Sequence, residues 1–399
     1  MQSVDDYLNE ILAAIAPLPP EDVALDDALG TVLAADVRAA WPLPGFDNSA
    51  MDGYAVLAAD VADPPVTLPV DAEVAAGDTT QRVLVPGRSV KIMTGALLPD
   101  GADAVVPVEW TDGGTDAVVI KVAAAKGHAL RRTGDDAQPG DLLLPAGTRL
   151  GPAQVGVLAA AGHAAVTVRR RPRVTVISTG DELAPPGSPL VPGLIWDSNS
   201  YLLAAAARQA GCEVERHSPQ RDDPQAVLAA VDRAVMEADL VVTSGGVSMG
   251  GEHDVVKAAL TGSGSMTFRK VAMQPGMPQG FGLLGSRETP VFTLPGNPVS
   301  AFVSFTVFVA PAVRALQGIQ NEQMPLRTAR LTGTVHSPDG KRSFLRGILD
   351  AEAAAVTPLT GQSSHQIAAL ARANALIIVP EPVTSLPEGE QVQVLELHP

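Results

Sequence analysis

Strand and helix patterns alternate between residues 173 and 318, and this alternation constrains the fold more than any other feature of the chain. The apolar runs at residues 174–178 and 240–243 are typical of buried strands. Residues 198–210 between them have the pattern of a helix, and Pro224 opens a second helix. Because strands that alternate with helices build a sheet covered by helices, this region is predicted to be a doubly wound α/β domain. Two further strands are predicted at residues 267–272 and 291–294.

The regions on either side are rich in short strands. An amphipathic helix capped by Ser3 and ended by Pro17 opens the chain, and residues 55–135 show short strands between turns. From Leu326 onward, short strands separated by Pro and Gly turns predict a small all-β barrel or sandwich. We therefore expect an α/β plus β protein with several domains. The predicted units are a helical and β linker domain (1–45 with 137–172), a β-rich inserted domain (46–136), the α/β domain (173–318) and a C-terminal β-barrel domain (319–399).

Composition limits what the chain can bind. Its 399 residues are 46% apolar and 18% charged, so it can bury several cores and global disorder is excluded. The net charge of −16 argues against nonspecific nucleic-acid binding, which needs a basic surface. The single cysteine, Cys212, excludes a disulfide framework and a thiolate zinc cluster, and it fits a reducing compartment.

Two observations bear on membranes. No basic and then apolar leader opens the sequence, and prolines interrupt the uncharged stretch of residues 289–313. A buried strand, a turn and a helix explain this stretch better than a membrane span does. We therefore expect a cytoplasmic protein with no nucleic-acid partner and no membrane span.

Polar or glycine-rich segments follow three predicted strands of the α/β domain. In open α/β sheets, ligands bind beyond the carboxyl ends of the strands. Gly245 and Gly246 would let backbone N–H groups converge on an anion, and Asn297 followed by Pro298 would open a helix whose first N–H groups favour phosphate. A tight turn explains each segment alone, but three at one edge favour a ligand site. The segments are STGDEL (178–183), SGGVSMG (244–250) and PGNPVS (295–300).

Carboxylates crowd the same predicted edge. Oxygen-only acidic groups beside phosphate-binding loops suit Mg²⁺, which is held by one or two carboxylates plus substrate oxygens. A turn or a helix cap is the alternative for each, above all for Asp181 and Asp223. Other sites are excluded, because the chain has no GxxxxGK[ST] loop, no dinucleotide fingerprint and no nucleophile elbow around Ser248. The acidic residues are Asp181, Glu182, Asp222, Asp223 and Asp254.

The loop PGFDNSAMDGY, at residues 44–54, mixes two carboxylates with apolar side chains. An exposed turn would not need Phe46, Met51 and Tyr54 between its polar groups. Loops of this kind are usually held against another surface, and binding residues concentrate on them. A turn that caps itself is the alternative.

These motifs recur in one order over about three hundred residues, and together they closely resemble the molybdopterin molybdenumtransferases. This is the MoeA family, whose animal relative is the E domain of gephyrin. The resemblance implies an elongated homodimer with its active cleft between subunits. It also implies Mg²⁺-dependent insertion of molybdate into adenylylated molybdopterin, with release of AMP. The motifs are PGFDNSAMDGYAV, KIMTGALLP, RRTGDD, PAGTRL, ISTGDEL, RDDP, SGGVSMGGEHD and LPGNPVSAF.

The resemblance also implies roles for single residues, matched by position. The implied catalytic residues are Asp52, Thr94, Asp136, Glu182, Asp222, Asp254 and Lys270, with Asp222 and Asp254 as the Mg²⁺ ligands. Those implied for substrate binding are Ser178, Gly245, Gly246, Ser248, Asn297 and Ser300. Those implied for molybdate binding are Gln274, Pro278, Arg346 and Ser364.

One segment departs from the family pattern. Family members commonly carry KPGKP where this chain has QPGMP, so Gln274 and Met277 replace two lysines near the oxyanion. Each lost charged hydrogen bond should weaken the attraction for molybdate by about 1–3 kcal/mol. Lys270, Arg346 and the loop amides are the groups that would compensate.

Two other functions stay open at this point. The first is a gephyrin-like scaffold that keeps the fold and the dimer and binds a peptide of another protein. The second is a molybdopterin adenylyltransferase, whose single domain resembles residues 173–318. The intact acidic and phosphate motifs favour the molybdenumtransferase.

Overall fold

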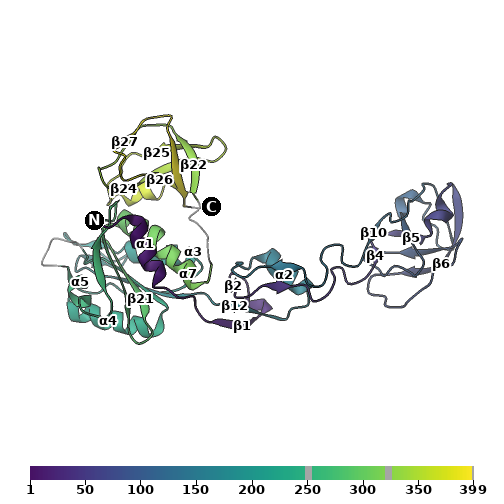
Figure 1. Ribbon diagram of the computed structural model, residues 1–399, viewed down its shortest axis with the longest axis horizontal. Helices are drawn as coiled ribbons and strands as arrows, with labels where there is room; N and C mark the ends of the chain where they lie inside the picture. The colour runs from purple at the N-terminus through teal and green to yellow at the C-terminus, as the bar shows by residue number, and fades with distance from the viewer. Residues whose placement is uncertain (248–253, 320–325, 398–399) are drawn as a thin grey trace.

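The computed structural model describes residues 1–247, 254–319 and 326–397. The molecule is elongated (Figure 1), with an α/β body and a β barrel at one end and a β-rich domain at the other. A small sheet covered by a helix lies between the two ends. The predicted elongated α/β plus β architecture is confirmed.

The α/β body contains a six-stranded sheet of order β16-β13-β17-β21-β20-β18. The first four strands are parallel, whereas β20 and β18 run antiparallel at one edge. This antiparallel edge was not predicted; it arises because a short turn joins β20 to β21 as a hairpin. The strands are β13 (Arg173–Ser178), β16 (Glu213–Arg216), β17 (Leu240–Ser244), β18 (Thr267–Lys270), β20 (Pro278–Leu284) and β21 (Thr289–Leu294).

Helices cover both faces of this sheet, as expected for a doubly wound domain. Two apolar clusters divide them, one with α1, α3, α6 and α7, and the other with α4 and α5. The small parallel pair β14 (Leu183–Ala184) and β15 (Ile195–Trp196) lies between β13 and α3 in the chain. The helices are α1 (Val4–Ala13), α3 (Asn199–Gln209), α4 (Pro224–Glu237), α5 (Val255–Leu260), α6 (Pro298–Ser304) and α7 (Ala310–Leu316).

Helix α1 packs on the α/β body. The Ser3 hydroxyl accepts a hydrogen bond from the Asp6 N–H at 3.0 Å, which confirms the predicted cap. Tyr7 is buried and its ring meets Phe308 edge to face, with centroids 5.0 Å apart. The first helix therefore shares a core with the α/β strands, and the division of the chain into four units stays a prediction.

The described residues contain one helix that is long and apolar enough to cross a membrane, Pro298–Leu316, with mean hydropathy 1.8. It joins α6 and α7 through a π-helical turn, η4 (Phe305–Val309). Pro311 cannot donate to the carbonyl four residues earlier, and the π turn accommodates this gap. The fold buries 72% of the segment, as it does a core helix.

The middle of the molecule is built from two distant parts of the chain. A three-stranded sheet of order β1-β12-β2 pairs the N-terminal region with residues 165–169. A second pair, β3 with β11, continues toward the far domain. The elements are β1 (Pro20–Ala24), η1 (Leu25–Asp27), β2 (Val32–Leu33), β3 (Val37–Arg38), β11 (Leu142–Leu144), α2 (Pro152–Ala160) and β12 (Ala165–Arg169).

The far domain carries a five-stranded sheet of order β8-β5-β7-β6-β9, beside the short pair β4 and β10. Short strands between turns were predicted over residues 55–135, and β6, β7, β8 and β9 are present there. The elements are β4 (Asn48–Ser49), β5 (Gly53–Val56), η2 (Ala58–Val61), β6 (Val66–Val74), β7 (Ser89–Ile92), β8 (Ala104–Pro107), η3 (Val108–Trp110), β9 (Ala117–Ile120) and β10 (Leu130–Arg131).

The C-terminal domain is a small closed barrel. The ladder β24-β25-β22-β28-β26 returns to β24, so the strands form a ring. Strand β19 (Met273–Gln274) of the α/β region pairs with β24 and attaches the barrel to the body. The barrel elements are β22 (Leu326–Leu331), β23 (Val335–His336), β24 (Arg342–Asp350), β25 (Ala355–Pro358), α8 (Ile367–Leu370), β26 (Ala375–Val379), β27 (Ser385–Leu386) and β28 (Gln391–Glu396).

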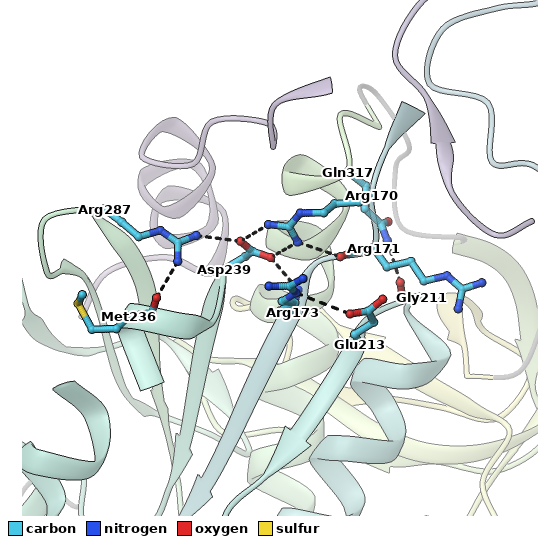
Figure 2. Close-up of polar contacts among 9 residues, drawn as sticks. All are labelled: Arg170, Arg171, Arg173, Gly211, Glu213, Met236, Asp239, Arg287 and Gln317. Carbon is cyan, nitrogen blue, oxygen red and sulfur yellow. Dashed lines mark hydrogen bonds and ion pairs between the residues drawn. The ribbon is translucent and has the colours of Figure 1, made fainter. Parts of the chain in front are cut away.

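A buried carboxylate joins the middle sheet to the α/β body. The Asp239 side chain is 1% exposed and accepts hydrogen bonds from Arg170 at 2.6 and 2.8 Å, from the Arg173 N–H at 2.8 Å and from Arg287 at 3.3 Å (Figure 2). Burial alone would raise the pKa of Asp239, but these donors outweigh it and hold the pKa below the ordinary value. Because Arg170 directly follows β12, this cluster fixes the end of the middle sheet against the body.

Candidate functional site

A cavity of about 670 Å³ lies at the carboxyl ends of β13, β17 and β21. The three polar segments that the sequence placed at this edge all contribute to its wall. A loop of the barrel also reaches it, through His365 and Ile367. The lining residues used below are Ser178, Glu182, Trp196, Asp197, Asn199, Asp222, Gly245, Gly246, Asp254 and Asn297.

The two acidic segments of the sheet edge are bonded to each other. The Asp181 N–H donates to the Asp222 carboxylate and the Asp222 N–H donates to the Asp181 carboxylate, both at 3.3 Å. Glu182 and Asp222 line the cavity, and Asp254 lines it from the start of α5. The predicted crowding of carboxylates is therefore present for these residues.

Asp223 is a helix cap, which was the alternative to a metal-binding role for this residue. Its carboxylate accepts a hydrogen bond from the Gln225 N–H at 3.0 Å and so caps α4. This residue is a helix cap and does not line the cavity.

The glycine loop after β17 is shaped by packing. Gly245 and Gly246 have φ values of 102° and 64°, and a Cβ on Gly245 would lie 2.6 Å from the Thr179 carbonyl oxygen. The Gly245 N–H donates to the Leu294 carbonyl at 3.1 Å, so this amide is already used within the fold. The predicted anion nest is wrong for the Gly245 amide, and for Gly246 it stays a prediction. Ser248 lies outside the described residues.

Residues around the start of α3 complete the wall of the cavity, and the sequence analysis did not predict them. Ser178 is buried and donates to the Asp197 carboxylate at 3.1 Å, and that carboxylate also accepts from the Ser200 N–H at 3.0 Å. The Asn199 amide donates to the Ser244 hydroxyl at 2.8 Å and to the Gly296 carbonyl at 2.6 Å. The signal was the sequence WDSNS (196–200), at the start of the helix predicted over residues 198–210.

The barrel meets the start of α6 through one serine. The Asn297 amide donates to the Ser364 hydroxyl at 3.0 Å, and the Val299 N–H donates to the Ser364 carbonyl at 3.1 Å. Asn297 is thus at the predicted N-cap position, but its side chain reaches the barrel instead of the helix. Ser300 is 5% exposed and lies in the first turn of α6.

Arg346 is buried behind this barrel loop, with 1% of its surface exposed. Its guanidinium donates to the carbonyls of Gly361 and Ser363, while its Nε–H has no partner among the described residues. Burial lowers the pKa of Arg346. This arginine therefore supports the loop that carries Ser364.

The QPGMP segment lies at the joint between body and barrel. Gln274 is exposed and pairs with Ser343 of β24, whereas Pro278 begins β20. Lys270 is exposed at the end of β18. These three residues are not among the described residues that line the cavity.

Asp52 and Thr94 come together at the far end of the molecule. The Thr94 N–H and hydroxyl donate to one Asp52 oxygen at 2.6 and 2.7 Å, and these bonds hold the pKa of Asp52 below its ordinary value. Asp136 is exposed in the same domain. Phe46 and Met51 of the 44–54 loop are 48% and 41% exposed, so within one chain they are not covered.

The far domain with Asp52 and the α/β body with the cavity lie at opposite ends of the molecule (Figure 1). Strands β4 and β5, which flank Asp52, lie at one end of the long axis, and β21, whose carboxyl end borders the cavity, lies in the body at the other end. A single chain therefore does not bring Asp52, Thr94 and Asp136 to the cavity carboxylates.

The fold and the site together define a class: an elongated protein whose α/β domain has an acidic cavity that a loop of the C-terminal β barrel reaches. Family models agree along the chain. "MoeA N-terminal region (domain I and II)" matches residues 2–162, "Probable molybdopterin binding domain" matches 175–315, and "MoeA C-terminal region (domain IV)" matches 328–397.

The curated relatives that match the whole chain are named as the same enzyme. Molybdopterin molybdenumtransferase 2 of Mycobacterium tuberculosis is 46% identical over 407 residues, with 100% of each chain covered. Molybdopterin molybdenumtransferase 1 of the same organism is 40% identical, with 99% of this chain and 98% of the relative covered. A solved MoeA protein of Pyrococcus horikoshii is 33% identical with a TM-score of 0.82, covering 100% of this chain and 99% of its own. The chain belongs to the molybdopterin molybdenumtransferase (MoeA) family and is an enzyme of molybdenum cofactor biosynthesis.

These comparisons also bear on the alternatives. The relatives that match the whole chain are named as transferases, so a gephyrin-like scaffold is not favoured. The matches to the N- and C-terminal MoeA regions account for the parts that a single-domain adenylyltransferase lacks.

Proposed function

We propose that this enzyme inserts molybdate into adenylylated molybdopterin and releases AMP, with Mg²⁺ bound at the acidic edge of the cavity. The observation that carries the proposal is the cavity itself, whose wall joins three loops of the α/β sheet, the carboxylates of Glu182, Asp197, Asp222 and Asp254, and a barrel loop. A pterin nucleotide fits such a site, since α/β sheets bind nucleotides beyond the carboxyl ends of their strands. Its predicted setting is the cytoplasm.

The donor set fits Mg²⁺. Among residues 1–247, 254–319 and 326–397, no group of three or more His, Cys, Asp or Glu side chains could hold a metal ion alone. Mg²⁺ does not need one, because it commonly takes one or two carboxylates and completes its shell with water and substrate phosphate. Asp222 and Asp254 would hold the ion, with Glu182 beside them. A bound Mg²⁺ would neutralise phosphate charge as the phosphoanhydride is cleaved.

The chain's own groups position the substrate. The loop after β17 and the start of α6 would receive the phosphates, with Gly246 and Asn297 as contacts. Ser178 is fixed by Asp197, and this bond holds the first loop in place. Ser300, which is buried in the first turn of α6, stays a predicted substrate contact.

A homodimer would complete the site. Asp52, Thr94 and Asp136 cannot serve the cavity of their own chain, so we propose that they serve that of a second copy across a shared cleft. The exposed Phe46 and Met51 support this, because a partner subunit would cover them.

Molybdate is the second substrate. We propose that it binds near Ser364, on the loop that Arg346 supports, with Gln274, Pro278 and Lys270 as its further predicted contacts. Fewer lysines than in relatives with KPGKP should leave this pocket with a weaker attraction for molybdate.

The test is direct. Purified protein is incubated with adenylylated molybdopterin, molybdate and Mg²⁺, and AMP release is followed by chromatography. AMP release that requires both molybdate and Mg²⁺ supports the proposal. A folded protein that releases no AMP above background contradicts it.

A further inference from the structure

One large aromatic side chain, Trp196, lines the cavity. Trp196 is 50% exposed and neighbouring Ile195 is 56% exposed. Among the described residues that line the cavity, Trp196 is the only Phe, Tyr or Trp. Aromatic residues make up only 4% of this chain, and exposed apolar side chains in a cavity mark ligand-binding surfaces.

The backbone on both sides of Trp196 is fixed to the acidic loop. Strand β15 pairs with β14, the Ile195 N–H donates to the Glu182 carbonyl at 2.8 Å, and the Asp197 N–H donates to the Ala184 carbonyl at 2.9 Å. The Asp197 carboxylate is itself buried and bonded to Ser178. Trp196 therefore sits at a defined place beside the carboxylates.

The indole ring is held as well. Its Nε1–H donates to the Ser188 carbonyl at 3.0 Å, which restricts rotation of the side chain. A ring that is already ordered loses little conformational entropy when a ligand stacks on it. The arrangement is that of a preformed stacking surface.

The charge of the cavity makes such a surface useful. The described lining residues include Glu182, Asp222 and Asp254 but no Lys or Arg. These residues offer an anionic nucleotide no Lys or Arg ion pair, so beyond the proposed Mg²⁺ part of its affinity has to come from uncharged contacts. Stacking of a heterocycle on an aromatic ring supplies such a contact.

We propose that the indole of Trp196 stacks on a planar heterocycle of the substrate, the purine or the pterin, and fixes its position in the cavity. This inference rests on the proposed function. It names a substrate-binding side chain outside the set that the motifs implied.

Binding measurements with two probes test it. Dissociation constants for AMP and for 6-hydroxymethylpterin, each with Mg²⁺, are measured by calorimetry on the wild-type protein, Trp196→Ala, Trp196→Phe and Trp41→Ala. Trp41 is 72% exposed outside the cavity and gives a matched control. Trp196→Ala should weaken one probe by about 5- to 150-fold, the range for stacking of one base on an aromatic side chain. Trp196→Phe should retain most of the affinity, and Trp41→Ala all of it.

The probe that loses affinity identifies the ring that stacks. For AMP, a variant with Trp41→Phe and Trp110→Phe leaves Trp196 as the single indole, and its fluorescence should be quenched on binding. Unchanged affinity of a bound probe in Trp196→Ala overturns the stacking proposal while the proposed function stands. Equal losses in Trp196→Ala and Trp196→Phe also overturn it, since the ring face would then not matter. If neither probe binds the wild-type protein, the stacking proposal falls, and the AMP-release assay decides the proposed function separately.

Discussion

Asp239→Asn should destabilise the α/β body strongly, although the change is nearly isosteric. Asp239 is 1% exposed and is the carboxylate on which Arg170 and Arg287 converge (Figure 2). Removing one partner of a fully buried ion pair costs about 3–5 kcal/mol. Because the two arginine side chains are 26% and 46% exposed and can regain water, the expected loss is smaller, about 2–3 kcal/mol.

The measurement is thermal unfolding by scanning calorimetry at pH 7. A loss of this size should lower the Tm of the α/β body by about 4–12 °C, the range for a unit of about 150 residues that unfolds cooperatively. Glu213→Gln is the matched control, since Glu213 pairs with Arg173 at 3.7 Å in the same region but is 63% exposed. That control should change the free energy of unfolding by less than about 0.5 kcal/mol.

The pH dependence gives a second check. The pKa of Asp239 is lower in the folded protein than in the unfolded chain, so the ionised carboxylate stabilises the fold above the unfolded pKa of about 3.9. The difference between wild type and Asp239→Asn should be constant from pH 5 to 8 and shrink as the pH falls below about 4. A Tm for Asp239→Asn equal to that of the control, or a difference that grows with acidity, would refute this reasoning.

Three further predictions concern the site. Asp254→Asn should nearly abolish AMP release at limiting Mg²⁺ with an unchanged far-UV spectrum, because the metal loses a charged ligand; wild-type turnover would reject Asp254 as a ligand. Asp52→Ala should lower AMP release with little change in Tm, and loss of Tm with activity kept would make the Asp52–Thr94 contact a structural turn. Replacing Gln274 and Met277 by lysine should lower the molybdate concentration for half-maximal rate, because each cation attracts a dianion. An unchanged molybdate dependence in that variant would place the oxyanion away from the QPGMP segment.

Local patterns in the sequence were enough to predict most elements. The apolar runs of β13 and β17, the Ser3 cap of α1 and the Pro224 start of α4 depend on side chains close together in the chain, and all were predicted correctly. The sequence also predicted that three polar segments would meet at one edge, because parallel strands end on the same side of a sheet.

Contacts between distant residues decided the rest. The antiparallel edge strand β20, the bond between Asn297 and Ser364 and the pairing of Gln274 with Ser343 depend on which surfaces meet in space. The same holds for Gly245, whose amide is used by Leu294 and not by a ligand. Two segments that are hydrogen-bonded to each other but far apart in the chain show no periodic pattern that reveals the bond. Only the tertiary structure could therefore show which polar groups the fold satisfies and which remain for a substrate.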